Sequence, residues 1–323
     1  MSTGGHLGAI GSGGAFEGFD DTDFDAYLRP KWSSNAYTLH RRRAKDRLLS
    51  LGRTVGSELE EELANLELGA SDEAPSVANG RSVQAQWVYF TRAAELRASL
   101  KSLLSRTDLA SGASLFDISV QHQHINLHLR LDATGFCVGV EIAAKAMVDR
   151  DNAKAKLAHG WARDQLLGLC KALPVASQIG FVPHLKDALT LTAEDVAEFA
   201  EAFSPTASAF IVQAPIGRED GVLGQQSFVG TAVEYVAHLL PVYRFFAWDR
   251  DNDHTQVRDQ VEKRKKAKKK AETAALQPGS RVTILAGLFS GRAGYLQEID
   301  NKGRAKVMVG PVSVTLDLKD IKA

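Results

Sequence analysis

Residues 278–321 read PGSRVTILAGLFSGRAGYLQEIDNKGRAKVMVGPVSVTLDLKDI. Apolar residues in this stretch fall on alternate positions, as in Val282 and Ile284 and again in Val307 and Val309. A period of two predicts β-strands with one buried face. Turn-forming residues separate the runs at Gly287, at Gly291, at 301–303 and at 310–311. Five short strands in so short a segment predict a small closed or nearly closed barrel.

The order and spacing of these turns resemble those of a known family. The matching residues are Pro278-Gly279-Ser280-Arg281-Val282, Gly287-Leu288-Phe289, Gly291-Arg292-Ala293-Gly294, Tyr295-Leu296, Ile299-Asp300-Asn301-Lys302-Gly303 and the closing strands to Ile321. The segment, about one seventh of the chain, resembles the KOW motif of NusG-type transcription elongation factors and large-subunit ribosomal proteins. The resemblance implies a five-stranded SH3-like β-barrel over 278–323 that contacts RNA, the ribosome or RNA polymerase. The family also contains barrels that bind only proteins.

Candidate nucleic-acid contacts in this segment are its basic residues and one aromatic residue. Arginine and lysine contact phosphates, and Phe289 at the loop tip is expected to stack on a base. The alternative is that Phe289 packs back over the barrel. Gly291 and Gly294 mark a loop where the backbone turns sharply or approaches a neighbour closely, and Gly303 marks a further turn. The basic candidates are Arg281, Arg292, Lys302, Arg304 and Lys306.

A basic segment precedes the barrel. Residues 251–277 are expected to form a helical linker, because positions 254–276 are rich in Lys, Ala, Glu and Gln and contain no Gly or Pro. Cations that neutralise phosphates release counterions, so this segment predicts salt-dependent binding without sequence specificity. The alternatives are a soluble spacer or a nuclear-import signal. The candidate phosphate contacts are Lys263, Arg264, Lys265, Lys266, Lys268, Lys269 and Lys270, seven cations in eight positions.

Charge is distributed unevenly along the 323 residues. The formal net charge is zero, but residues 251–323 carry 15 basic and 9 acidic side chains, a balance of +6 that leaves −6 on residues 1–250. The C-terminal quarter is therefore expected to meet a polyanion. The two cysteines, Cys137 and Cys170, give neither a disulfide framework nor a metal pattern, which predicts a cytoplasmic setting. No leader and no long apolar run are found, so no membrane association is expected.

Residues 1–15 are glycine-rich and predict a flexible tail, whereas residues 16–250 predict one α+β domain with a mainly antiparallel sheet. Strands are predicted at 83–91, 115–120, 124–131, 136–143, 208–214 and 242–248. Helices are predicted at 54–67, 93–106, 151–172, 192–203 and 230–240. Residues 132–135 predict a hairpin turn. No known family is recognised in residues 16–250, which are the candidate surface for a separate protein partner.

An acidic-aromatic segment with Phe19, Phe24 and Tyr27 opens this domain. We expect it to dock on its own domain, the alternative being a partner protein. A basic run at 40–47 then predicts a helix with a cationic outer face. Its arginines are expected to pair with the aspartates upstream, the alternative being contact with phosphate.

A histidine pattern gives a first candidate metal site. On a strand, His122, His124, Asn126 and His128 share one face. Imidazoles at this spacing can ligate zinc, with Glu141 as a further ligand. No second Cys/His motif accompanies these residues. The favoured explanation is therefore an ordinary strand with alternating side chains, whose polar face is exposed to water. No cofactor is therefore expected.

Asp132, Glu141 and Lys145 faintly resemble the carboxylate-carboxylate-lysine sites of restriction-type nucleases. Those sites set acid and lysine two positions apart on a strand, whereas here the gap is four and Ala143 stands where the lysine belongs. No phosphate loop, nucleophile elbow or dinucleotide fingerprint is present. The sequence therefore favours a nucleic-acid-associated binding protein over an enzyme. The alternative is a metal-dependent nucleic-acid-processing enzyme with its site in the α+β domain.

Overall fold

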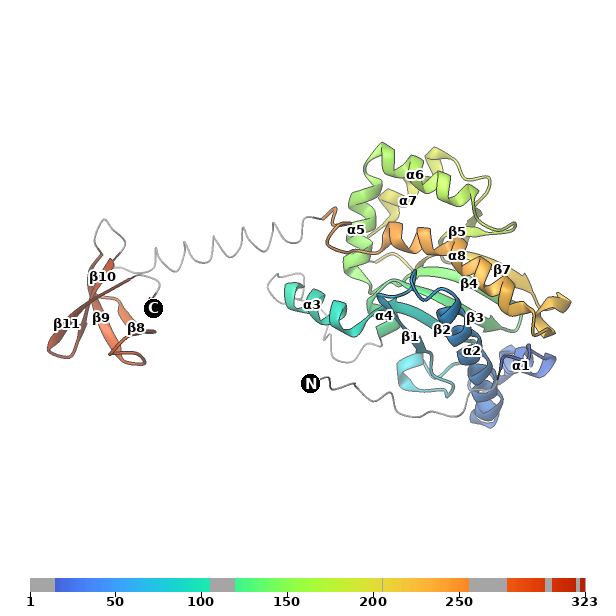
Figure 1. Ribbon diagram of the computed structural model, residues 1–323, viewed down its shortest axis with the longest axis horizontal. Helices are drawn as coiled ribbons and strands as arrows, with labels where there is room; N and C mark the ends of the chain where they lie inside the picture. The colour runs from blue at the N-terminus through green and yellow to red at the C-terminus, as the bar shows by residue number, and fades with distance from the viewer. Residues whose placement is uncertain are drawn as a thin grey trace. The chain divides into compact units, whose positions relative to one another are not determined.

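A computed structural model describes residues 15–104, 120–204, 206–255, 278–299, 304–317 and 320–322. The described chain forms two compact units. The last described residue of the first unit is Thr255, and the second unit contains residues 278–322. Figure 1 shows the helices and strands of both units.

The first unit is built on an antiparallel sheet whose described strands lie in the order β1-β2-β3-β4-β7-β5-β6. Every neighbouring pair is antiparallel, which confirms the predicted α+β class. The hairpin at 132–135 is also confirmed, because Asp132 Oδ1 accepts the backbone N–H of Thr134 at 2.8 Å. The strands are β1 (Leu66–Ala70), β2 (Ala85–Arg92), β3 (Asn126–Asp132), β4 (Gly135–Ile142), β5 (Gln178–Phe181), β6 (His184–Asp187) and β7 (Phe210–Gly217).

Two long helices cover one face of this sheet (Figure 1). They are α2 (Thr38–Glu58) and α8 (Phe228–Phe246), and both bury apolar side chains against alternate sheet residues such as Leu127, Leu129 and Val140. Burial of this apolar layer is the main stabilising term of the unit. The remaining α-helices are α1 (Asp21–Asp25), α3 (Ala94–Leu104), α4 (Val120–Gln123), α5 (Met147–Leu157), α6 (Gly160–Lys171) and α7 (Ala193–Ala202).

The acidic-aromatic segment docks on its own unit, as predicted. Phe16, Phe19, Phe24 and Tyr27 are all buried in the main core. The ring of Phe19 lies 5.8 Å from that of Phe136 on β4, within the range of favourable aromatic pairs.

The basic run pairs with the aspartates of that segment, which is also as predicted. Arg43 and Arg47 of α2 form ion pairs with Asp20, and Arg47 forms a second pair with Asp23. These arginines therefore serve to hold the segment in place.

Of the helix predicted at 54–67, residues 54–58 are helical, and the prediction is wrong for the rest. The observed helix α2 starts much earlier, at Thr38, and ends at Glu58, while Leu66 begins strand β1. Gly52 lies within α2, at a point where a Cβ would be only 3.1 Å from Leu68 Cδ1 and from Val88 Cγ2. The glycine lets the helix lie close on the sheet and does not end it.

Three further predictions in this unit need correction. The strand predicted at 242–248 is the C-terminal part of α8, which continues through Pro241. The helix predicted at 151–172 is two helices, α5 and α6, and the short strands β5 and β6 were not predicted. Of the strand predicted at 115–120, residues 115–119 lie outside the described residues and Val120 begins α4.

The second unit is a curled antiparallel sheet of five described strands in the order β11-β10-β9-β8-β12. The five strands agree with the prediction, but no pairing among the described residues joins β11 to β12, so the sheet is not a closed barrel. Its core includes Val282, Ile284, Leu296, Val307 and Ile321. The strands are β8 (Arg281–Ile284), β9 (Ala293–Ile299), β10 (Arg304–Val309), β11 (Val312–Asp317) and β12 (Ile321–Lys322).

Candidate nucleic-acid interface

The outer face of the second sheet carries a row of exposed side chains that crosses four strands. Tyr295 on β9 lies opposite Arg281 on β8 and Met308 on β10, and Met308 lies opposite Ser313 on β11. We call these four residues the Tyr295 row. Tyr295 keeps 60% of its surface exposed and Met308 keeps 40%. The strand alternation that buries Leu296 and Val307 in the core turns Tyr295 and Met308 outward.

Lys306 adds a second positive charge beside the row. It is exposed on β10, two residues before Met308 and therefore on the same face, opposite Thr315 of β11. Glu298 lies opposite Lys306 on the other neighbouring strand. An exposed aromatic ring between an arginine and a lysine is the arrangement on which a nucleic-acid base stacks while its phosphates meet the cations.

Two other predicted basic residues of this unit, Arg292 and Arg304, are also exposed. Arg292 directly precedes β9, and Arg304 starts β10 opposite Asp317 of β11. Lys302 and Gly303 lie outside the described residues. Of the basic candidates, Arg281 and Lys306 are therefore those that the fold brings beside Tyr295.

Phe289 agrees with the alternative that the sequence left open, because its side chain is half-buried and packs against the core of the second unit. The residue that stands fully exposed at the loop tip is Leu288, with 100% exposure. Tyr295 takes the place of Phe289 as the candidate base-stacking residue. The alternation of Gly294, Tyr295 and Leu296 could have identified it, because a buried glycine and leucine on either side leave the tyrosine outside.

The two glycines of the motif act for different reasons. Gly291 lies in the loop with a φ of +81°, a backbone conformation that favours glycine. Gly294 lies inside strand β9 and not in the predicted loop. A Cβ on Gly294 would stand 2.6 Å from Val307 Cγ1 and 2.7 Å from the Met308 carbonyl oxygen, so the glycine allows close approach of β9 and β10.

The Lys-rich run, residues 263–270, lies outside the described residues. Of the helical linker predicted over 251–277, residues 251–255 are not helical and residues 256–277 are outside the described residues. In the sequence, seven residues separate the seven cations of the run from Pro278.

The histidines of the first unit do not form the predicted set. His122 lies in helix α4 and His124 precedes strand β3, so only Asn126 and His128 share a strand face. This part of the face is not exposed to solvent, because Asn126 and His128 are both buried. Asn126 Oδ1 lies 3.1 Å from His128 Nδ1. Gly139 explains the burial, because a Cβ there would stand 2.7 Å from His128 Nε2. The described residues contain no group of three or more His, Cys, Asp or Glu side chains placed to hold a metal ion.

Asp132 and Glu141 are likewise far apart. Asp132 pairs with Gly135 at one end of the β3–β4 hairpin, and Glu141 pairs with Asn126 at the other end. Six residues of strand separate the two positions, about 20 Å at the usual rise. Lys145 lies beyond the end of β4. The nuclease-like arrangement is therefore absent from these residues.

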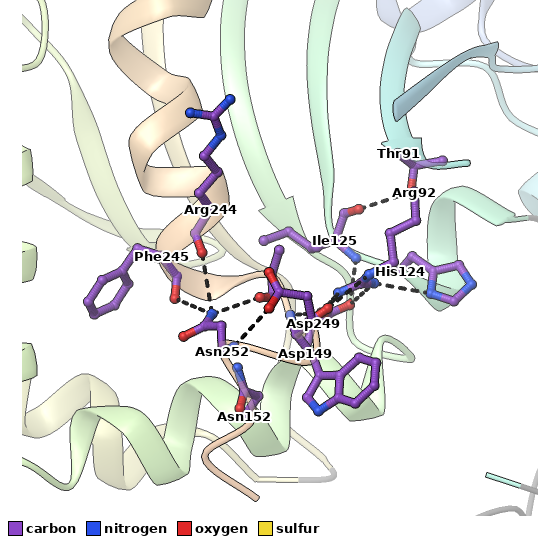
Figure 2. Close-up of polar contacts among 12 residues, drawn as sticks. Thr91, Arg92, His124, Ile125, Asp149, Asn152, Arg244, Phe245, Asp249 and Asn252 are labelled. Carbon is purple, nitrogen blue, oxygen red and sulfur yellow. Dashed lines mark hydrogen bonds and ion pairs between the residues drawn. The ribbon is translucent and has the colours of Figure 1, made fainter. Parts of the chain in front are cut away.

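The strongest polar network of the first unit is structural. Figure 2 shows Arg92 of β2 and Asp149 of α5, which form a buried ion pair with Arg92 Nη1 at 2.9 Å from Asp149 Oδ2. Asp149 also accepts the backbone N–H groups of Ile125 and Trp248, each at 2.9 Å. Arg92 Nη2 donates to the carbonyl oxygen of Trp248 at 2.8 Å. Burial alone raises the pKa of Asp149, but the Arg92 charge and these hydrogen bonds outweigh it, so the pKa lies below its ordinary value.

Two histidines with lowered pKa values, His128, which is buried, and His124, which is half-buried, predict acid lability of the first unit. Burial, and then the charge of Arg130, lower the pKa of His128 to about 3; burial, and then Arg92, lower that of His124 to about 4. Below an ordinary pKa of 6.5 the unfolded chain binds protons that the folded chain does not. The contribution of each neutral histidine to the free energy of unfolding is therefore fully present above pH 6.5. As the pH falls below 6.5, each histidine reduces the free energy of unfolding by up to about 1.4 kcal/mol per pH unit, until the pH reaches the pKa of that histidine in the folded protein.

Urea unfolding between pH 7 and pH 5 measures this loss. We expect His128→Gln to reduce the pH dependence of the unfolding free energy, and to reduce it more than the control His184→Gln, which replaces an exposed histidine at the start of β6. An unaltered pH dependence in His128→Gln would show that this histidine is already protonated in the folded protein.

Comparison of the chain with protein-family models and with curated proteins gives no match. Within the described residues, no helix combines the length and apolar character needed to cross a membrane. Both cysteines, Cys137 and Cys170, are free and buried. The candidate interface therefore rests on the geometry of the second unit and on the charge of the Lys-rich run.

Proposed function

We propose that the protein binds single-stranded nucleic acid, RNA in the first place, through the outer face of the second sheet and the Lys-rich run. The observation that carries the proposal is the Tyr295 row, an exposed aromatic ring with Arg281 opposite it and Lys306 on the same face. Base–aromatic stacking is tolerant of sequence, and the cations supply attraction to the backbone.

The two parts have different tasks. The Lys-rich run supplies most of the affinity, because each neutralised phosphate releases counterions. The Tyr295 row orients the strand by stacking one base. The resemblance to the KOW motif, with the SH3-like barrel that it implies, adds the ribosome or the transcription complex as the expected location of that RNA. Five antiparallel strands in a curled sheet agree with such a barrel in strand number and direction.

The test is the binding of a fluorescent oligouridylate, a strand with little stacking of its own, to full-length variants. Tyr295→Ala is expected to weaken binding about 5- to 100-fold, since stacking on one aromatic side chain is worth about 1–3 kcal/mol. Tyr295→Phe keeps the ring and serves as the matched control, with affinity close to that of the wild type. Tyr295 is exposed, so neither change is expected to unfold the sheet.

Equal affinities of Tyr295→Ala and wild type would remove the Tyr295 row from the interface. A pull-down from a lysate then tests the larger partners. We expect the wild type to recover ribosomes, RNA polymerase or RNA, and a variant lacking residues 254–323 not to recover them. Equal recovery by both would contradict the proposal as a whole.

A further inference from the structure

A second exposed aromatic cluster lies on the first unit, where its described chain ends. Trp161 at the start of α6 is 54% exposed. Its ring is stacked with that of His159 at a centroid distance of 6.2 Å and an interplanar angle of 17°. The ring of His254 lies 5.8 Å from Trp161 and 6.3 Å from His159. We call these three residues the Trp161 cluster.

The cluster is held in place by buried hydrogen bonds. Asn152 of α5 is buried, and its Oδ1 accepts the backbone N–H of His254 at 2.8 Å. Lys156, also buried on α5, donates to Asn252 Oδ1 at 2.8 Å and to the carbonyl oxygen of Phe245 at 3.0 Å. Asn252 in turn donates to the carbonyl oxygens of Phe245 and Ala247, at 3.1 and 2.7 Å; Figure 2 shows Asn152, Asn252 and Phe245 in this network. The segment that carries His254 is therefore fixed on α5.

The turn that carries the other two rings is fixed as well. Arg163 of α6 donates from Nη1 to the carbonyl oxygen of Leu157, the last residue of α5, at 3.0 Å. Lys156 places its Nζ 6.0 Å from the centre of the Trp161 ring, at the outer limit of a cation–π contact. Burial, and then Lys156 and His159, lower the pKa of His254, while Asp253 acts in the opposite direction. The cluster therefore presents an exposed flat ring, that of Trp161, with the positive charge of Lys156 near it.

The Lys-rich run begins within reach of this cluster. Eight residues lie between His254 and Lys263, so no conformation of the chain places the first residue of the run more than about 30 Å away. A tether of this length raises the effective concentration of one site for a ligand held at the other. A strand that stacks a base on Trp161 therefore has further phosphates near seven cations.

We infer that the Trp161 cluster is a second base-stacking site, at which Trp161 and the flanking imidazoles hold an unpaired base of the single-stranded RNA bound by the Lys-rich run. This inference rests on the proposed function and extends the interface onto the first unit. It also gives that unit a part in ligand binding. Double-stranded nucleic acid does not fit the site, because its bases are already stacked on one another.

The test uses tryptophan fluorescence and binding affinity together in the full-length protein. A roughly 20-nucleotide oligouridylate, which is longer than one site, is expected to quench the fluorescence of the wild type. Trp161→Phe is expected to lose most of that quenching and to keep most of its affinity, because phenylalanine still stacks. Trp161→Ala is expected to bind about 5- to 100-fold more weakly. Trp87→Phe, at a half-buried position on β2, is the control that keeps the quenching.

The outcomes separate the inference from the proposed function. If the wild type binds the oligonucleotide, and Trp161→Phe is quenched as fully as the wild type or Trp161→Ala binds as tightly, the inference is overturned and the proposed function stands. If the wild type does not bind the oligonucleotide at low salt, both are overturned. Quenching of the wild type by a duplex to the same extent as by the single strand would also overturn the inference.

Discussion

Asp149→Ala is expected to destabilise the first unit by about 3–5 kcal/mol, the usual cost of removing one partner of a buried ion pair. The substitution leaves the buried Arg92 guanidinium without its counter-charge. It also removes the acceptor for two buried backbone N–H groups, those of Ile125 and Trp248. A domain of ordinary stability holds only about 5–15 kcal/mol in total, so the loss is a large part of it.

Equilibrium unfolding in urea, followed by circular dichroism, measures this effect. The matched control is Asp164→Ala, which removes an exposed carboxylate from α6 and is expected to change stability by less than about 0.5 kcal/mol. A double variant, Arg92→Met with Asp149→Leu, is expected to be more stable than Asp149→Ala alone, because no buried charge then lacks a partner. A loss below about 1 kcal/mol in Asp149→Ala would mean that water reaches Arg92 in the folded protein.

Neutralising the Lys-rich run is expected to have the largest effect on binding. Replacing its seven cations with glutamine removes up to seven phosphate contacts. With a single strand this lowers the dependence of log K on log salt by about 0.7 per contact, or about 5 in all. Affinity at moderate salt is then expected to fall by about 10²- to 10³-fold.

The matched control replaces the six lysines of the run with arginine, which keeps every charge. Its affinity and salt dependence are expected to match those of the wild type, because this term depends on charge and not on side-chain geometry. Fluorescence anisotropy of a labelled oligonucleotide at several salt concentrations measures both quantities. A glutamine variant that binds as the wild type does would show that the run is a spacer.

The second unit could be predicted well because its signal is local. Alternation within β8 to β11 and the turns between them indicate four antiparallel strands, and the structure has these four and the short closing strand β12. The local sequence does not decide which aromatic residue is buried and which is exposed. Phe289 packs on the core and Tyr295 points outward, and this depends on the register between β9 and β10 as well as on position in a loop.

The errors in the first unit have two physical sources. The apolar run at 242–248 fits a buried helix as well as a buried strand, since periodicity cannot separate the two, and the long helix α8 includes most of it. The leucines at 59, 63 and 66 have helical spacing, yet α2 ends at Glu58 and Leu66 pairs with Arg92 in the sheet. In both cases tertiary pairing overrides the local pattern.

The Trp161 cluster of the first unit could not be found from sequence patterns. His159, Trp161 and His254 come together only because Asn152 and Lys156 hold residues 252–254 on α5. The histidine pattern at 122–128, which did stand out, is interrupted by the boundary between α4 and β3. Contacts between residues about 100 positions apart leave no periodic trace.

The most direct measurement of the central claim is the affinity of the full-length protein for a single-stranded oligonucleotide as a function of salt. We expect tight binding at low salt and a linear fall of log K with log salt, with a slope of about −4 to −5 from the Lys-rich run. No binding at low salt, or an affinity that salt does not change, would contradict the claim that the protein binds nucleic acid through its basic C-terminal quarter.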